Sequence, residues 1–379
     1  MTHAPAAEPT TFQLDVRRRA RAAADWLVRS IEACDGGGSS AYYSRFYRPL
    51  TGWAPPYPET TGYIIPTLID YAAYAGEPRY AEIALQQADW VMSLQFEDGA
   101  LPGGFVVKGR RATPSIFNTG QMILGLVAAA DHSGKSQYLD SASRAARWLA
   151  GEVDPDAGTW TRHAYKGGFS PAYYTRVCWP MLEVWERTRE ESIRTAAARV
   201  LDTIASWQQP NGAITNWAFG ADDPAFTHTI AYTLRGFWES GRLLNAEPYL
   251  TAAHRGADAM RRSLERRGRL AGAYDRELEG RWWYTCLTGN CQMALVWMRC
   301  ADSLNDVRYV SAAFKALGFV LERQRVSGGA AGTRGAIAGS SPIWGRYLTL
   351  RHPNWATKFL LDALMEADAR VTRIAAGVS

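Results

Sequence analysis

Two kinds of hydrophobic segment alternate along the chain, and both recur at similar intervals. The first kind is amphipathic and carries a large apolar residue after a run of small or polar ones. Successive members lie 53 to 64 residues apart, and the large residues are Trp26, Trp90, Trp148, Trp207, Met260 and Phe319. A repeat of this length on a helical hydrophobic pattern predicts a series of equivalent amphipathic helices.

The second kind of segment is more apolar and opens with small hydroxyl or amide residues. Six such openings interleave with the amphipathic segments, at residues 59–63, 117–121, 174–176, 227–229, 288–290 and 353–355. Because each apolar helix is followed by an amphipathic one, the pattern predicts six helical hairpins.

The connections between these helices alternate in length. Links from an apolar helix to the next amphipathic one are short, as at residues 75–78, whereas the return links span roughly 15 to 28 residues and are rich in glycine and aromatic residues. If the apolar helices form an inner ring, every long loop falls on the same rim. We therefore expect an all-α (α/α)6 toroid with a bowl formed by the long loops, and strands only in short loop hairpins. A single domain should cover residues 11–372, between a disordered tail at 1–10 and a second tail at 373–379.

Composition narrows the class of protein. The 379 residues are 47% hydrophobic, and 42 Lys and Arg against 37 Asp and Glu give a formal charge of +5, too weak to indicate nucleic-acid binding. The chain has no apolar run long enough for a membrane span and no signal-peptide pattern, and its five cysteines lack paired spacing. These features predict a cytoplasmic protein. Metal-ligand spacing and nucleotide-binding glycine motifs are also missing, so we expect no cofactor and no metal.

Three sequence stretches carry a family resemblance. The stretches WVMSLQFEDGALPGGF, SWQQPNGAITNWAFG and TTGYIIPTLIDYA, together with the six-hairpin count, resemble the six-hairpin glycosidase-like superfamily over nearly the whole chain. Terpene-cyclase and prenyltransferase toroids share this pattern of Trp and Gln before Asp-Gly or Asn-Gly. The resemblance implies the toroid and a saccharide substrate. Similar cytoplasmic toroids accompany polysaccharide-building enzymes, which implies association with such partners.

Glycoside hydrolysis requires two carboxyl groups, one protonated and one ionised. Among the carboxylates expected on the rim, the best pair is Glu59, immediately ahead of an apolar helix, and Asp275, in a loop. We therefore take Glu59 and Asp275 as the first catalytic candidates, with glycoside hydrolysis as the first reaction.

A second group of residues fits elimination or C5 epimerisation of a uronate. His228 and Tyr232 share one helix face, and Tyr284, Asn118 and Arg176 provide further hydrogen-bonding groups. Such reactions need a base, an acid and a neutralised carboxylate, which these side chains supply without a carboxylate pair. A hydrogen-bonded core His and Tyr fits His228 and Tyr232 equally well.

Two further alternatives stay open. A terpene cyclase would protonate its substrate through a DxDD motif, but Asp222 and Asp223 lack the first Asp of that motif. A saccharide-binding protein without catalysis would show the same aromatic loops and would tolerate loss of the acid and base groups.

The substrate is expected to be an anionic saccharide of the uronic-acid type. Six helix N-termini should face the bowl, and Arg176 at one of them is unfavourable unless an anion joins it. Asn or Thr at such positions also caps helices. The expected substrate-binding residues are Asn118, Gln121, Arg176, Tyr284, Asn290, Trp217, Trp283, Trp344, Asn354 and Lys358.

Overall fold

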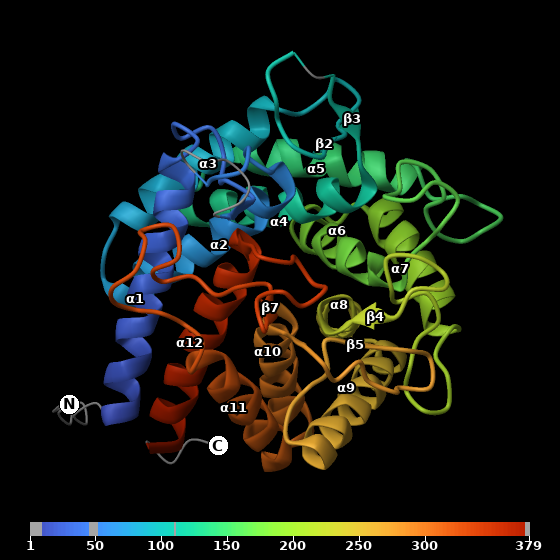
Figure 1. Cartoon of the computed structure of the whole chain (residues 1–379). Coiled ribbons are helices and arrows are strands. Elements are labelled where there is room, and N and C mark those ends of the chain that lie inside the picture. Colours follow the sequence, from blue (N-terminus) through green and yellow to red (C-terminus); the bar gives the residue numbers. More distant parts are fainter. Residues whose placement is uncertain (1–9, 45–51, 110, 376–379) are drawn as a thin grey trace, which may run out of the picture.

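Inner and outer helices alternate along the chain and form two concentric rings (Figure 1). The structure, a computed structural model, describes residues 10–44, 52–109 and 111–375, and these contain twelve α-helices. The inner ring consists of α2 (Pro58–Ala75), α4 (Ile116–Ser133), α6 (Thr175–Thr188), α8 (Thr227–Leu244), α10 (Leu287–Leu304) and α12 (Asn354–Ala375). The outer ring consists of α1 (Thr11–Glu32), α3 (Arg79–Ser93), α5 (Ser136–Gly151), α7 (Glu191–Ala205), α9 (Glu247–Arg267) and α11 (Val307–Leu321). The expected (α/α)6 toroid is confirmed.

Each inner helix packs against its two inner neighbours and most extensively against one outer helix. The outer partner follows directly in sequence for α2, α4, α6, α8 and α10, but α12 packs against α1 from the other end of the chain. First and last helices therefore close the ring, which places the two ends of the described chain side by side (Figure 1).

The short links begin where the inner helices stop. Five of the inner helices end at a residue in the left-handed backbone conformation, namely Gly76, Gly134, Arg189, Asn245 and Asn305. Gly and Asn adopt this conformation most easily, so they stop a helix and turn the chain toward the next one. Arg189 is the exception, and its positive φ of 58° carries a local cost.

Glycines let neighbouring inner helices approach closely. A Cβ on Gly62 of α2 would meet Met122 Cα of α4 at 2.5 Å, and one on Gly125 of α4 would meet the Gly62 carbonyl oxygen at 2.3 Å. Neither distance is sterically allowed, so α2 and α4 can pack this closely only because both positions are glycine.

Short strand pairs hold the long loops together. The four pairs join β1 (Tyr42–Tyr43) to β8 (His352–Pro353), β2 (Pro102–Gly103) to β3 (Thr113–Pro114), β4 (Ala225–Phe226) to β5 (Ala273–Tyr274), and β6 (Thr285–Cys286) to β7 (Ser340–Ser341), all antiparallel. Only β2–β3 is a hairpin within one loop. The expectation of strands confined to loop hairpins is therefore wrong for the other three pairs, which link different loops around the rim because those loops converge at one end of the toroid.

The last helix runs three residues beyond the boundary expected at 372, to Ala375. Residues 1–9 and 376–379, which belong to the two expected tails, lie outside the described residues. Helices of the described part of the chain lack the combination of length and apolarity that crossing a membrane requires.

Candidate active site

Glu59 lies in the first turn of α2, on the rim side of the inner ring, and is 9% exposed. Pro58 starts this helix, since proline suits a first helical position where no N–H is needed. Burial raises the pKa of Glu59 to about 7, although hydrogen bonding to Tyr57 and the positive charge of Arg176 oppose the shift. A carboxyl group with this pKa can donate a proton near neutral pH.

His228 lies in the first turn of α8 and is 5% exposed. Its Nδ1 lies 2.8 Å from Oε1 of Gln292 on α10. Burial lowers the pKa of His228 to about 3, with the Gln292 hydrogen bond opposing this and the Arg176 charge adding to it. A neutral imidazole that donates from Nδ1 to an amide oxygen leaves Nε2 as its basic nitrogen.

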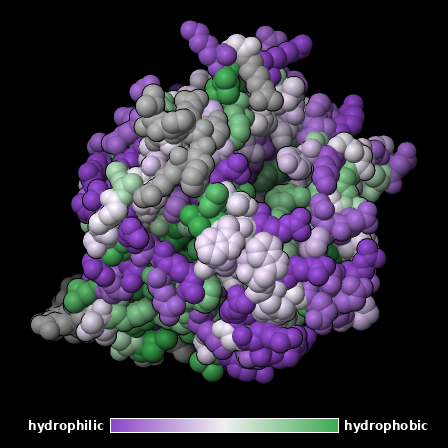
Figure 2. Space-filling model, viewed as in Figure 1, coloured by the Kyte–Doolittle hydropathy of each residue, from purple (hydrophilic) through white to green (hydrophobic). Residues whose placement is uncertain are grey.

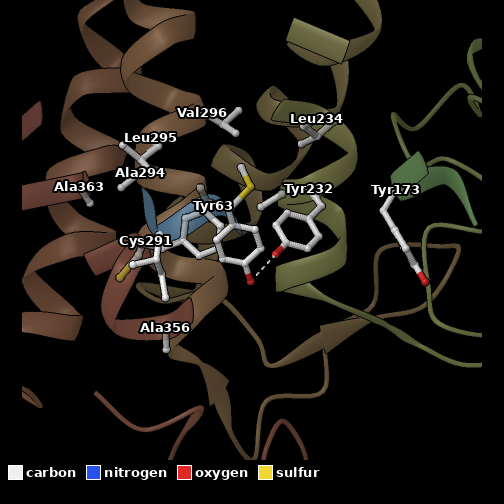
Figure 3. Packing of buried hydrophobic residues seen from close by; sticks show 14 of the residues in the cluster. Tyr63, Tyr173, Tyr232, Leu234, Cys291, Ala294, Leu295, Val296, Ala356 and Ala363 are labelled. Atoms are coloured by element: carbon white, nitrogen blue, oxygen red, sulfur yellow. Dashed lines mark hydrogen bonds between the residues drawn. The ribbon is translucent and has the colours of Figure 1, made fainter. Parts of the chain in front are cut away.

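Tyr232 links the surroundings of Glu59 and His228. Its ring centroid lies 4.2 Å from that of His228, one helical turn earlier on α8. Its hydroxyl donates to the hydroxyl of Tyr63 on α2 at 3.3 Å, and Figure 3 shows the two side chains pointing toward one another across the ring. Glu59 contributes to raising the pKa of both tyrosines, which burial raises most. The expected i, i+4 contact between His228 and Tyr232 is therefore present, and Tyr232 interacts electrostatically with Glu59.

Arg176 is 3% exposed and is held without any carboxylate ion pair among the described residues. Its Nε donates to Gln121 Oε1 at 2.9 Å, and the Gln121 amide donates back to the Arg176 carbonyl oxygen. The guanidinium carbon lies 4.6 to 5.8 Å from the ring centroids of Tyr232, Trp179, Phe359 and Tyr63. Aromatic faces and an amide thus surround this buried cation where a carboxylate would be the usual partner.

The amide residues at the inner-helix starts attach rim loops to the helices. Asn118 donates to the Pro102 carbonyl oxygen at 3.4 Å and contacts the Tyr57 hydroxyl. Asn290 donates to the Cys286 carbonyl oxygen at 2.8 Å, and Asn354 donates to the Ser39 hydroxyl at 2.9 Å. Among these three, Asn118 is the one in contact with a group that touches Glu59.

The remaining predicted site residues bind other partners, lie in core clusters or are exposed. The carboxylate of Asp275 accepts hydrogen bonds from the backbone of Glu277 at 3.1 Å and of Glu279 at 2.8 Å, so it stabilises its own turn. Trp283 and Trp344 are exposed, at 53% and 66%. Trp217 and Tyr284 are buried in core clusters, and Lys358 forms an ion pair with Asp362 inside the ring.

The acidic pair considered for a terpene cyclase is a surface feature. Asp223 is exposed and forms an ion pair with Lys166 at 3.2 Å. An exposed, paired carboxylate is a poor proton donor to a hydrocarbon.

Aromatic rings that sequence reasoning did not select surround the candidate acid and base. Ring contacts with centroids 5.1 to 6.0 Å apart run from Phe117 through Tyr173, Phe219, Phe226 and Tyr347 to His228. Beside Glu59, Tyr57 contacts Phe105 at 5.5 Å and Trp355 at 6.4 Å. Most of these rings lie at or just before an inner-helix start, whereas Phe105, Phe219 and Tyr347 lie in the rim loops 7 to 11 residues before one.

The loop side of the toroid is polar at its edge and apolar toward its middle. Figure 2 shows this face with hydrophilic residues around the periphery, apolar residues nearer the centre and a hollow among them. Aromatic residues are typical of saccharide sites, because sugar rings stack on aromatic faces.

Comparisons with known proteins find the same architecture. No family model and no curated protein sequence matches the chain. Among solved structures, the chain is similar to an unsaturated glucuronyl hydrolase specific for heparin, with 13% identity, 95% and 98% of the two chains covered and a TM-score of 0.73. The unsaturated glucuronyl hydrolase from Bacillus sp. GL1 is 15% identical, with 96% of this chain and 97% of that chain covered and a TM-score of 0.73.

A second group of similar structures consists of sugar epimerases. The cellobiose 2-epimerase from Spirochaeta thermophila DSM 6192 gives 14% identity, 96% and 100% coverage and a TM-score of 0.71. At these identities the likeness establishes the fold, the six-hairpin (α/α)6 toroid that the sequence resemblance implied.

Proposed function

We propose that this protein is a carbohydrate-active enzyme in which Glu59 donates and His228 accepts a proton at a saccharide bound in the bowl. The observation that carries the proposal is the pairing of a carboxyl group whose pKa is raised to about 7 with an imidazole whose pKa is lowered to about 3. At neutral pH this pair offers an acid and a base at once. The fold shared with glucuronyl hydrolases and sugar epimerases supports a saccharide as the substrate.

An acid and a neutral base favour proton transfer at a sugar carbon. Both reactions remove a proton from a carbon next to a carbonyl or carboxylate. Epimerisation then returns a proton to the opposite face of the same carbon, whereas elimination expels the neighbouring oxygen, which takes up a proton; Glu59 and His228 can supply the acid and the base for either reaction. Hydrolysis by Glu59 and Asp275 stays a prediction, because Asp275 interacts with its own turn. Hydrolysis with Glu59 as the acid and a water activated by His228 is the second candidate, supported by the similarity to the two hydrolases.

The proposed substrate carries a carboxylate. Six inner-helix N-termini surround the bowl, and Arg176 adds a buried positive charge just behind Tyr232. Arg176 is covered by rings and bound to Gln121, so its proposed effect on the substrate is electrostatic attraction at a distance. Comparing turnover of matched acidic and neutral oligosaccharides across salt concentration tests this charge preference. Equal rates on both would overturn it.

The reaction type is tested by product analysis in D2O with wild type, Glu59→Gln and His228→Gln. An epimerase incorporates deuterium at a carbon of recovered substrate, a lyase releases an unsaturated uronate that absorbs ultraviolet light, and a hydrolase adds water without either change. We expect deuterium incorporation or unsaturation that both substitutions abolish. Full activity in both variants would refute the assignment of the acid and the base.

A further inference from the structure

A second polar space lies inside the inner ring, further along the helices than the proposed active site. It has a volume of about 40 Å³ and is lined by residues of α6, α8, α10 and α12. Two of its lining residues, Arg235 and Asp362, lie two helical turns beyond His228 and Asn354, away from the bowl. The cavity exceeds the roughly 10–15 Å³ that one water needs, so it has room for a small ion with water.

The charged side chains that line this cavity are mostly cationic. Arg176, Arg235 and Lys358 contribute positive charge, and Asp362 is the single carboxylate among the lining residues. Side chains of the three cations are at most 14% exposed, and Arg176 makes no ion pair among the described residues. Burying charge is costly unless opposite charge compensates it, and here one carboxylate faces three cations.

The neighbouring carboxylates are already engaged. Glu239 accepts from Arg235 at 2.6 Å, from Arg299 at 2.9 Å and from Arg242 at 3.3 Å, so three cations share it. Asp362 pairs with Lys358 and accepts from the Thr67 hydroxyl at 2.7 Å. Asp70 lies near Asp362, and desolvation together with the charge of Asp362 raises the pKa of Asp70 to about 6, which limits the negative charge it adds.

Hydrogen-bond donors also outnumber acceptors on the cavity wall. Gln292 lines the cavity, and its carbonyl oxygen is committed to His228, which leaves its NH2 group as the remaining polar group. Guanidinium and ammonium groups are donors only. A cavity with this wall attracts an acceptor that is small, negatively charged and able to receive several hydrogen bonds.

We propose that this cavity binds one monovalent inorganic anion of the size of chloride, between Arg176, Arg235 and Lys358. The anion completes the charge balance of the inner ring and receives hydrogen bonds from the cations and from Gln292. This site differs from the proposed active site, because neither Glu59 nor His228 is among its lining residues, and the rings of Tyr63, Tyr232 and Phe359 pack around the Arg176 guanidinium.

Occupancy of the site affects the proposed active site through Arg176. The positive charge of Arg176 lowers the pKa of both Glu59 and His228, so an anion beside it raises both pKa values. Besides His228, the titratable and charged groups that face Arg176 are Glu59 and Tyr63 on α2, Tyr232 and Arg235 on α8, and Lys358 and Asp362 on α12. This consequence rests on the proposed function, whereas anion binding itself does not.

Binding is tested on the full chain without any substrate. The protein is moved into sodium gluconate and titrated with sodium chloride at constant ionic strength, with the melting temperature and the 35Cl NMR line width as readouts. We expect a saturable rise in Tm of about 2 °C at chloride well above its Kd, because ligands that bind only the folded state stabilise it. Crystals soaked in sodium bromide should show an anomalous peak in the cavity.

Two variants separate the cavity from general charge effects. Arg235→Gln removes a lining cation and should abolish the chloride-specific rise in Tm. Arg242→Gln removes a half-exposed cation that pairs with the same Glu239 but does not line the cavity, and it should keep the rise. Identical melting of wild type in chloride and gluconate, an empty cavity after the bromide soak, or an unchanged response in Arg235→Gln overturns the proposal. If Arg235→Gln fails to fold, the bromide peak in wild type decides.

Discussion

Burial favours the uncharged forms of the two central side chains of the proposed active site. Glu59 and His228 are both located in the first turn of an inner helix, and in both cases desolvation disfavours the charged form. For the carboxyl group the result is an acid that still holds its proton near neutral pH, and for the imidazole it is a ring that stays neutral. One physical cause therefore yields two complementary roles.

The first prediction concerns the activity of Glu59→Gln. The substitution keeps the shape of the side chain but removes its proton, so kcat should fall about 10²- to 10⁴-fold, the usual contribution of general acid–base catalysis. In wild type, activity should fall as pH rises through about 7, because Glu59 must be protonated to act. Steady-state rates between pH 5 and 9 check both outcomes, and an unchanged rate in the variant would exclude Glu59 as the acid.

The second prediction concerns stability at the same position. The pKa of Glu59 is higher in the folded than in the unfolded protein, so its contribution to stability is fully present below about pH 4.5 and is lost as pH rises through about 7. Glu59→Gln should therefore gain stability relative to wild type above pH 7, by on the order of 3 kcal/mol. Urea unfolding at pH 5 and pH 8 measures the difference, and equal values at both would refute the buried, protonated carboxyl.

The third prediction concerns His228. Its pKa is lower in the folded than in the unfolded protein, so its imidazole should remain neutral at pH 5 and stability should fall as pH drops below about 6.5. NMR of the imidazole nitrogens checks the charge and the tautomer with the proton on Nδ1. Protonation of His228 above pH 5 would contradict its assignment as the neutral base.

At the scale of elements, glycine has different roles in the inner and the outer helices. Between α2 and α4 the helices touch through Gly62 and Gly125, so a methyl group there has no room. On the outer helix α11, a Cβ at Gly318 would meet nothing within 4 Å. The same residue type is thus needed for packing in one ring and only weakens the helix in the other.

The fourth prediction compares these positions. Gly125→Ala should lower stability by about 1–3 kcal/mol, because α2 and α4 must separate to admit the methyl group. Gly318→Ala, the matched control, should raise stability by about 0.5–1 kcal/mol, because alanine favours a helix. Thermal unfolding of both variants measures the contrast. A Gly125→Ala protein as stable as wild type would show that the two helices are not in close contact.

Over the whole molecule, the ring depends on the contact between its first and last helices. Asp368 on α12 is buried and accepts hydrogen bonds from Gln13 at 2.9 Å and Arg17 at 2.9 Å on α1, and from Tyr74 at 2.7 Å on α2. Burial alone would raise the pKa of Asp368, but these three donors outweigh it and hold the pKa below its ordinary value. The Asp368 carboxylate therefore links α12 to both α1 and α2, where the ring closes.

The fifth prediction is that Asp368→Asn loosens this closure. Stability should fall by about 2–3 kcal/mol at neutral pH, since a buried network loses its charged acceptor. The loss should shrink as pH falls below about 3.8, where wild type also loses the ionised carboxylate. Asp15→Asn is the control, because Asp15 pairs with Arg18 and Arg19 within α1 near the surface and should have little effect. Equal unfolding free energies for Asp368→Asn and wild type would contradict this role.

The repeating pattern of the chain determined the architecture. Alternation of apolar and amphipathic helices at intervals of 53 to 64 residues specified six hairpins, and the difference between short and long links specified which end carries the loops. Helical periodicity is a local property, so a single sequence reveals it. The same reasoning located Glu59 and His228 at helix starts on the rim side.

Only the tertiary structure decided what surrounds those two residues. His228 is hydrogen-bonded to Gln292, which lies 64 residues later in the sequence, and Arg176 to Gln121, which lies 55 residues earlier. The carboxylate of Asp275 accepts hydrogen bonds from its own turn. Strand pairing between different loops also depends on where the ring brings them together. Burial and neighbouring charge set each pKa, and both arise from helices that are distant in sequence. The sequence could therefore propose the acid and the base, but the closed ring determines whether each is charged.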